Sequence, residues 1–424
     1  MDKYLISGGR RLEGSVYVSG AKNAALALIA ASILAPGETI LENVPRIADV
    51  KILLNIVEKL GAKVAWLEEN TVSLTVPEKI DYIAPHSLVK RLRASNLLLG
   101  GLLAARGKAQ ISMPGGCNIG IRPMDLHLKG LHALGAEVEI EHGFIKASGR
   151  LQGNRVYLDF PSVGATENIM MAATRAKGTT IIENVAKEPE IVDLANFLNA
   201  MGAKVRGAGT DLIRIEGVKE LKSTCYSVIA DRIEAGTLMV AGAITRGNVT
   251  IGKVISRHLQ PVIAKLREMG VEIIEDEEYV HVAAGDPLKP TDIKTLPYPG
   301  FPTDMQSQMM AILATCQGTS VIVENVFENR LQVAEELNRM GANIKVEGQT
   351  AVVQGVEKLS GAHVRSCDLR SGAGLVLAGL AAEGVTEVSN IRLIDRGYEK
   401  FEQKLNQLGA QIRRVQVRDV SIDR

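Results

Sequence analysis

The chain has 424 residues, of which 49 are Lys or Arg and 48 are Asp or Glu, so its formal net charge is only +1. A chain of this length exceeds the size at which a single hydrophobic core stops growing, which favours two domains. The balanced charge provides no overall field for nucleic acid or an anionic membrane, so an anionic ligand needs a local cluster of cations.

The N-terminus and the cysteines indicate in which cellular compartment the protein is expected. Residues 1–9 read MDKYLISGG, and the longest apolar stretch, residues 24–36, is shorter than the roughly 20 residues that cross a bilayer. The four cysteines are widely separated and form no C-x-x-C pair, which argues against disulfides and structural zinc. We therefore expect a cytoplasmic protein with no metal, no cofactor, no membrane or nucleic-acid partner and no obligate protein partner.

A short phrase repeats along the whole chain. It consists of Leu or Met, then Gly, then Ala or Val, any residue, and Val or Ile. The copies are LGAKV at 60, LGAEV at 134, MGAKV at 201, MGVEI at 269, MGANI at 340 and LGAQI at 408, which are 67 to 74 residues apart. An amphipathic helical pattern precedes each copy and a β-type run follows it, so the Gly is expected to end a helix in a left-handed conformation.

A second helix of another kind is predicted in every unit. These helices are rich in small residues and apolar almost all round, which is typical of helices buried on every side. In chain order they lie in NAALALIAASILA, ASNLLLGGLLAA, NIMMAATRA, GTLMVAGAI, QSQMMAILATC and GAGLVLAGLAA. Each unit is therefore expected to run strand, buried helix, strand, surface helix, strand, and six units suggest two globules of three. Periodicity alone is equally compatible with a non-catalytic repeat ring or clamp, so departures from the repeat must indicate function.

Two departures lie in the first half of the chain. Lys22 and Asn23 stand at the start of the first buried helix, where a Lys is unfavourable unless an anion binds the same helix terminus. The second unit alone carries a Gly-rich segment, PGGCNIGIRPMDLH at 114–127, with Cys117 and Arg122. A thiol on such a loop is accessible to a ligand, and a nearby guanidinium can lower its pKa or bind a phosphate. The alternative for Cys117 is a buried structural thiol.

The other departures lie in the fifth and sixth units, at the entrances of helices. Asp304 and Asp368 precede the buried helices, where an N-cap role is the common explanation for Asp. Arg370 lies at the same entrance as Asp368, and Arg330 and Arg396 precede the surface helices of the fifth and sixth units. Cations gathered at helix N-termini in both halves suggest one anionic site in a cleft between two globules.

With these motifs the sequence resembles the enolpyruvyl transferase family, and within it the branch that acts on a UDP-linked amino sugar. The matching segments are SGAKNAAL at 19–26, RASN at 93–96, PGGCNIGIRPMDLH at 114–127, SVGAT at 162–166, EPEIVD at 188–193, FPTDMQ at 301–306, VFENR at 326–330, DLR at 368–370 and IDRGYE at 394–399. The resemblance implies an α/β fold, an inverse α/β barrel of two globular domains, each built of three repeated units of about 70 residues. It places one domain at 22–229 and the other at 1–21 and 230–424.

The resemblance also implies a reaction. The 3-hydroxyl of UDP-N-acetylglucosamine would add to phosphoenolpyruvate, and phosphate would leave from the resulting ketal. Cys117 would be the general acid and could carry a covalent adduct, and Asp304 would take the hydroxyl proton. Lys22, Arg122 and Arg396 would hold phosphate, while Asn23, Arg93 and Arg370 would order the remainder of the substrates.

The nucleotide-binding residues come from the resemblance as well. The UDP-sugar would be read by Asn23, Arg93, Arg122, Pro123, Met124, Asp125, Leu126, Ser162, Val163, Gly164, Asp304 and Val326. Phe160 departs from some relatives, which have a Lys near the diphosphate, so the resemblance assigns no nucleotide contact at this position. A shikimate-phosphate enolpyruvyl transferase is the nearest alternative, but that branch lacks the loop with Cys117.

Overall fold

The computed structural model describes residues 2–113, 115, 119–120 and 123–416. Two compact units are distinguished by their contacts. The N-terminal unit comprises described residues between 20 and 229, and the C-terminal unit comprises residues 2–19, 119–120 and 230–416. Each unit has its own cluster of buried hydrophobic side chains. The first change of unit follows Ser19, two residues before the boundary expected from the sequence, and the division into 22–229 and 1–21 with 230–424 stays a prediction.

The N-terminal unit contains three repeats. The first comprises α1 (Lys22–Ser32), β3 (Gly37–Glu42), α2 (Ala48–Lys59), β4 (Lys63–Trp66) and β5 (Val72–Val76). The second comprises α3 (His86–Val89), η1 (Arg93–Leu97), α4 (Leu98–Arg106), β6 (Lys108–Ser112), α5 (Asp125–Ala133), β7 (Glu137–Glu141) and β8 (Phe144–Ser148). The third comprises β9 (Arg155–Tyr157), α6 (Val163–Ala173), β10 (Thr179–Glu183), α7 (Pro189–Ala200), β11 (Lys204–Arg206) and β12 (Leu212–Glu216), and β13 (Cys225–Ser227) follows.

The C-terminal unit repeats the same plan. It begins with β1 (Asp2–Ser7) and β2 (Glu13–Tyr17) and resumes with α8 (Arg232–Ile244), β14 (Asn248–Gly252), η2 (Ser256–Leu259), α9 (Gln260–Glu268), β15 (Glu272–Glu275) and β16 (Tyr279–Ala283). Its second repeat contains β17 (Ile293–Lys294), η3 (Thr303–Met305), α10 (Gln306–Leu313), β18 (Thr319–Val323), η4 (Arg330–Gln332), α11 (Val333–Arg339), β19 (Asn343–Glu347) and β20 (Thr350–Gln354). Its third contains β21 (His363–Arg365), α12 (Leu369–Ala381), β22 (Val385–Ser389), η5 (Ile391–Arg396), α13 (Phe401–Gln407) and β23 (Gln411–Gln416).

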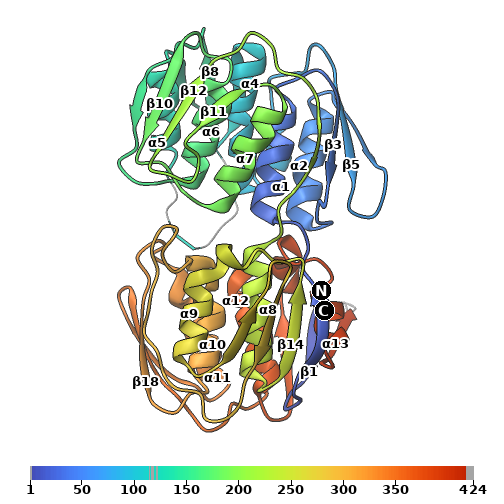
Figure 1. Cartoon of the computed structure of the whole chain (residues 1–424), viewed down its shortest axis with the longest axis vertical. Coiled ribbons are helices and arrows are strands. Elements are labelled where there is room, and N and C mark those ends of the chain that lie inside the picture. Colours follow the sequence, from blue (N-terminus) through green and yellow to red (C-terminus); the bar gives the residue numbers. More distant parts are fainter. Residues whose placement is uncertain (1, 114, 116–118, 121–122, 417–424) are drawn as a thin grey trace, which may run out of the picture. The chain divides into compact units, whose positions relative to one another are not determined.

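Each repeat contributes one small sheet. In five of the six sheets described, a parallel pair continues into antiparallel strands, as in the order β17-β18-β20-β19. The sheet of the second repeat has three strands, β6-β8-β7. Strands distant in sequence complete three sheets, because β13 pairs with β3, β2 pairs with β14, and β1 lies between β22 and β23. In each unit, helices pack against one another in the interior and the strands lie outside them (Figure 1).

The six buried helices are confirmed. In α1 every residue from Ala24 to Ser32 is buried, and in α12 every residue from Arg370 to Leu380 is buried. One expectation was incomplete, because an antiparallel pair of strands, and not a single strand, follows the surface helix in five repeats. The extra strand, such as Tyr279–Ala283, alternates buried residues with less buried ones, and it lies beyond the β-type run directly after each Gly on which the prediction was based.

The repeated glycine has the conformation that the sequence predicts. Gly61, Gly135, Gly202, Gly270, Gly341 and Gly409 have φ between +84° and +112°. A Cβ built on Gly270 would meet no atom within 4 Å. The requirement for glycine there is therefore set by the backbone conformation and not by lack of space.

Gly270→Ala is expected to lower the free energy of unfolding by about 1–2 kcal/mol, because Ala resists the left-handed conformation. Gly285→Ala is the matched control: a Cβ there also meets nothing within 4 Å, and the backbone has no positive φ. Denaturant unfolding of both variants measures the difference. Equal losses of stability would show that φ is not what selects glycine at Gly270.

Asp193 of α7 secures the end of the N-terminal unit. Its carboxylate accepts hydrogen bonds from the Tyr226 hydroxyl at 2.8 Å and from the Ile229 amide at 3.4 Å. Burial raises the pKa of Asp193 from 3.8 to about 6, against the opposing effect of these two donors. The folded protein thus binds this proton more tightly than the unfolded chain does. The protonated Asp193 therefore stabilises the folded state; this stabilisation is complete below pH 3.8 and is lost as the pH rises through about 6.

Asp193→Asn is therefore expected to gain stability relative to the wild type as the pH rises from 4 to 7.5, by up to about 3 kcal/mol. Guanidinium unfolding at both pH values gives the difference, and the exposed Asp211→Asn serves as control. A difference between variant and wild type that stays constant with pH would contradict the assignment.

Candidate active site

Asp304 lies at the centre of a charged cluster in the C-terminal unit. Its carboxylate accepts a hydrogen bond from Nη2 of Arg330 at 2.8 Å, and from Nε and Nη2 of Arg370 at 3.1 and 2.9 Å. The two arginines are each 2% exposed, whereas the Asp304 side chain is 26% exposed. The cluster therefore presents a carboxylate to solvent from a base of buried guanidinium groups.

The charge of the cluster is fixed by its own geometry. Burial on its own would lower the pKa of Arg370, but the charge of Asp304, with smaller contributions from Tyr398 and Asp231, outweighs burial and raises it. Arg370 therefore stays protonated in the interior. Its guanidinium can exchange Asp304 for another oxyanion without losing its charge.

A network of buried polar side chains contacts Asp304 and Arg370 and holds them in place. Nε2 of Gln308 donates to Oγ1 of Thr237 and to the carbonyl oxygen of Asp304, both at 3.0 Å, and to the Tyr398 hydroxyl at 3.2 Å. The guanidinium of Arg370 lies over the Tyr398 ring, 5.3 Å from its centre. Tyr398 lies within the matching segment IDRGYE, but the sequence analysis assigned no role to it. No pattern in the sequence indicated a role for Thr237 or Gln308.

The two aspartates that the sequence placed at helix entrances have different roles. Asp368 is the N-cap of α12: its carboxylate accepts from the Arg370 and Ser371 amides, and Ser371 completes a capping box. Asp304 lies in η3, one turn ahead of α10, and its carboxylate is turned to the arginines. The capping explanation therefore holds for Asp368, and Asp304 is engaged in the charged cluster.

Glu324 organises the turn next to this cluster. Its Oε1 accepts from the amides of Val326 and Phe327 at 2.9 and 3.1 Å, and its Oε2 accepts from Thr303 at 2.9 Å. Val326, which was predicted to contact the nucleotide, is thus held on the same framework as η3. Arg396 lies at the end of η5 and is half-buried.

In the N-terminal unit, Lys22 is the first residue of α1 and lies 3.0 Å from Asp49 of α2. The Lys22 side chain is 13% exposed and that of Asp49 is 1% exposed. The buried carboxylate offsets the unfavourable position of a cation at a helix N-terminus, and the sequence gave no indication of it. Asn23 is exposed, and Arg93 opens η1, which packs against α1 and α6.

The two segments predicted to read the nucleotide are brought together. Pro123 and Met124 precede α5, Asp125 and Leu126 begin it, and Ser162, Val163 and Gly164 begin α6. A Cβ on Gly164 would lie 3.1 Å from the His127 ring, so the N-terminal ends of α5 and α6 approach closely. His127 is 5% exposed and is hydrogen-bonded to Asn168 at 2.8 Å, which indicates a structural role. Adjacent helix N-termini favour an anionic group.

Cys117 and Arg122 lie outside the residues that the structure describes, and their roles stay predictions. Cys225 is exposed, Cys367 is half-buried and Cys316 is buried. Burial raises the pKa of the Cys316 thiol to about 12, against a smaller effect of Arg246. Cys316 is thus an unreactive core thiol.

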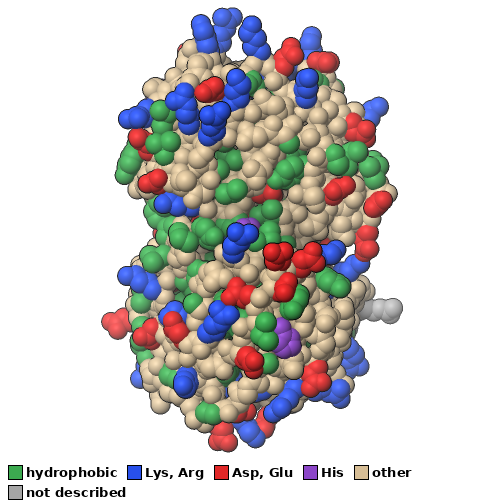
Figure 2. All heavy atoms as spheres, viewed as in Figure 1, with side chains coloured by type: hydrophobic (Ala, Val, Ile, Leu, Met, Phe, Trp, Pro, Cys, Tyr) green, Lys and Arg blue, Asp and Glu red, His purple; other side chains and the backbone are tan. Residues whose placement is uncertain are grey.

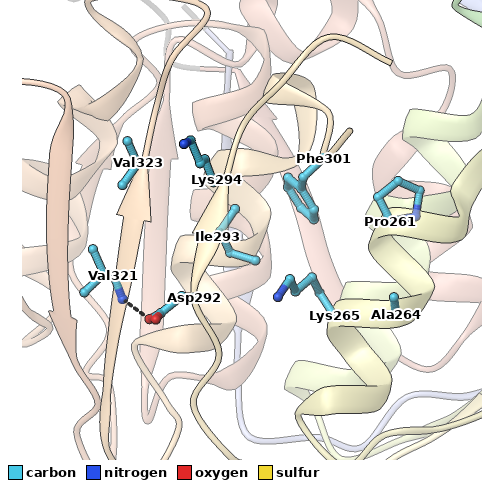
Figure 3. Close-up of a pocket in the computed structure, with 9 residues that line it drawn as sticks. All are labelled: Pro261, Ala264, Lys265, Asp292, Ile293, Lys294, Phe301, Val321 and Val323. Atoms are coloured by element: carbon cyan, nitrogen blue, oxygen red, sulfur yellow. Dashed lines mark hydrogen bonds between the residues drawn. The ribbon is translucent and has the colours of Figure 1, made fainter. Parts of the chain in front are cut away.

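A groove of about 490 Å³ lies on the C-terminal unit, between α9 and the strands β17 and β18 (Figure 3). Its lining is mainly apolar and includes Ile293, Phe301, Val321 and Val323. The carboxylate of Asp292 accepts from the Val321 amide at 2.8 Å and is thus committed to the backbone. None of the residues predicted from the sequence to be functional lines this groove.

The described surface shows no other obvious binding chemistry. Among the described residues, no group of His, Cys, Asp and Glu could hold a metal ion, and no helix is long and apolar enough to cross a membrane. On the face that Figure 2 shows, each unit carries both basic and acidic side chains.

Comparison with known proteins gives the family. Residues 6–405 match the family model described as EPSP synthase (3-phosphoshikimate 1-carboxyvinyltransferase). The chain is 58% identical to UDP-N-acetylglucosamine 1-carboxyvinyltransferase 2 of Carboxydothermus hydrogenoformans, over 98% of this chain and 100% of the relative. It is 56% identical to UDP-N-acetylglucosamine 1-carboxyvinyltransferase 1 of Caldanaerobacter subterraneus subsp. tengcongensis, over 97% and 99% of the two chains.

Solved structures agree with this relationship. The enolpyruvyl transferase NikO from Streptomyces tendae superposes with a TM-score of 0.89 at 26% identity, over 98% of this chain and 99% of that chain. EPSP synthase from Acinetobacter baumannii has a TM-score of 0.76 at 21% identity, over 98% and 100%, a likeness of fold alone. The α/β fold with two repeat-built units is thereby confirmed. The chain belongs to the EPSP synthase family of enolpyruvyl transferases.

Proposed function

We propose that this chain transfers the enolpyruvyl group of phosphoenolpyruvate to the 3-hydroxyl of UDP-N-acetylglucosamine and releases phosphate. The observation that carries the proposal is the identity of 53–58% to four relatives named for this activity, over nearly the whole chain. The reaction would be the first committed step towards peptidoglycan precursors, in the cytoplasm. We assign no cofactor and no obligate protein partner to it.

Asp304 is suited to receive the sugar proton. A proton acceptor must be ionised, and the two guanidinium groups beside Asp304 stabilise its carboxylate form. As the 3-oxygen forms its bond to the central carbon of phosphoenolpyruvate, Cys117 would supply a proton to the methylene carbon, which gives a tetrahedral ketal. The methyl group would then return a proton to the thiolate left on Cys117, and departure of phosphate yields the enolpyruvyl ether.

The phosphate and carboxylate groups need several cations. We assign Lys22, Arg122 and Arg396 to phosphate, and Arg370 to phosphoenolpyruvate as a further ligand. Arg370 is buried, permanently charged and already bound to a carboxylate in this structure, so its geometry suits an oxyanion. Asn23 and Arg93 are assigned to ordering the substrates.

The nucleotide is assigned to the paired helix ends of the N-terminal unit. Pro123 to Leu126 and Ser162 to Gly164 begin two helices that approach each other, and neighbouring helix N-termini favour an anionic group such as the diphosphate. Val326, Asn23, Arg93, Arg122 and Asp304 are the further predicted contacts.

The alternative within the family is transfer to 3-phosphoshikimate. The family model bears that name, but the solved structure of that class is only 21% identical, whereas the UDP-sugar relatives exceed 50%. A non-catalytic ring or clamp is disfavoured by the same relatives. The direct test is phosphate release from phosphoenolpyruvate with either acceptor. Release with 3-phosphoshikimate and none with UDP-N-acetylglucosamine would overturn the proposal.

Asp304→Asn is expected to lower kcat by about 100- to 10,000-fold, because the amide cannot take the sugar proton. The substitution keeps the shape of the side chain but removes the negative charge that Arg330 and Arg370 share, so the thermal midpoint is expected to fall as well, and kcat is measured well below that midpoint. A phosphate-release assay gives kcat, and the exposed Asp276→Asn of the same unit is the control. Turnover by Asp304→Asn at the wild-type rate would remove Asp304 from the mechanism.

Cys117→Ser is expected to abolish or greatly slow turnover and to prevent modification by the epoxide fosfomycin, since the hydroxyl is a poorer nucleophile than the thiolate. Intact-mass measurement after exposure should find one adduct on the wild type and none on the variant. Cys225→Ser, at an exposed thiol, should keep the adduct. An adduct that persists on Cys117→Ser would identify another cysteine as the reactive one.

A further inference from the structure

Arg414, on the last strand β23, holds together three elements of the C-terminal unit. Its Nη1 donates to Oδ2 of Asp395 at 3.0 Å and its Nη2 contacts Oδ1, so the guanidinium grips both carboxylate oxygens. Its Nε donates to Glu402 at 3.2 Å, and its Nη2 to the Tyr4 hydroxyl at 2.9 Å. The side chain thus joins η5, α13 and β1.

Asp395 is the residue immediately before Arg396, at the end of η5. The opposite side of η5 is fixed by packing, because Ile391 and Ile394 are fully buried and Ile394 lies against Gly372 of α12. A short 3₁₀ segment has few hydrogen bonds of its own to hold its last residue. The contact with Asp395 is therefore a polar restraint on the end of the segment that presents Arg396.

The charges around Arg414 make the restraint depend on this one cation. The carboxylates of Asp395, Glu402 and Asp2 all face its guanidinium, and Oδ2 of Asp2 lies 3.5 Å from Nη1 of Arg414. Hydrogen bonding to Asp395 is the main effect that raises the pKa of Arg414, and burial with the charge of Glu402 raises the pKa of Tyr4. Without the guanidinium, three carboxylates would repel one another, and Asp395 would move away together with the adjoining backbone.

We propose that Arg414 is a positioning residue for the transfer reaction: by binding Asp395 it orients Arg396 towards the phosphate of phosphoenolpyruvate. The inference rests on the proposed function, which assigns Arg396 to that phosphate. The competing explanation is that Arg414 only fastens the chain termini, since β1 and β23 are neighbouring strands. The two explanations differ in what a substitution does to substrate affinity.

The experiment compares full-length Arg414→Ala, Arg414→Lys, Asp395→Asn and the double variant Arg414→Ala/Asp395→Asn. Glu402→Gln removes another link of Arg414 but leaves Asp395 bound, and Arg413→Ala changes an exposed neighbour on the same strand. For each variant, KM for both substrates, kcat and the thermal midpoint are measured. Calorimetric binding of phosphoenolpyruvate without the sugar gives an affinity that does not depend on turnover.

Positioning predicts that Arg414→Ala and Asp395→Asn raise KM for phosphoenolpyruvate about tenfold or more and leave KM for the UDP-sugar within about twofold. The double variant should be no worse than the poorer single variant, because both act through one contact. Arg414→Lys should recover part of the affinity, since an ammonium cannot grip both oxygens. Glu402→Gln should lower the thermal midpoint without changing KM, and Arg413→Ala should change neither.

Unchanged KM in Arg414→Ala and Asp395→Asn, with a fall in midpoint like that of Glu402→Gln, would overturn the proposal and leave Arg414 a structural fastener. Additive effects in the double variant would overturn it as well. If Arg414→Ala does not fold, Arg414→Lys and Asp395→Asn decide by the same criteria. A wild-type chain that releases no phosphate would refute the proposed function separately, and the calorimetric affinities would then decide the role of Arg414.

Discussion

Two buried guanidinium groups are the constraint on which the arrangement of the C-terminal unit depends. Taking a charge out of water is costly unless a partner compensates, and Arg330 and Arg370 share Asp304 as that partner. The buried contacts of Gln308, Thr237 and Tyr398 keep Arg370 and the Asp304 backbone in register. A substrate oxyanion that replaces Asp304 on Arg370 would keep the guanidinium paired, so the cluster can change partners without leaving a bare charge in the interior.

Much of the fold follows from the sequence because it is periodic. The glycine of each repeated phrase needs a positive φ, and all six have one, so the ends of the surface helices could be placed to within a residue. The buried helices could be recognised because small apolar residues leave no polar face. The extra strand of each repeat, such as Tyr279–Ala283, was missed because a five-residue alternating segment is a weak pattern. The addition of β1 between β22 and β23 joins residues about 400 positions apart, and no local pattern contains that information.

The candidate site also contains residues that the sequence could identify and residues that only the structure reveals. Lys22 and Arg370 could be selected because a cation at a helix entrance departs from the repeat, whereas the role of Asp304 came from the family resemblance, since its position alone favoured a helix cap. Their partners could not be selected: Asp49 resembles any acidic residue in the first turn of a surface helix, and Gln308 lies inside an apolar helix. Whether an acid is a cap or a reagent depends on where its oxygens point, and residue spacing does not determine that direction.

The three buried helices of the C-terminal unit make this distinction concrete. Asp231 caps α8 and Asp368 caps α12, each by accepting amide hydrogens of its own helix. At the entrance of α10 the extra turn η3 carries Asp304, whose carboxylate meets Arg370 from the neighbouring repeat and Arg330 from its own. A 3₁₀ turn therefore replaces the first α-helical turn at this entrance, and the aspartate that caps the helix in two repeats here turns its carboxylate to solvent and cations. Repetition supplies the scaffold, and a local departure from it supplies the chemistry.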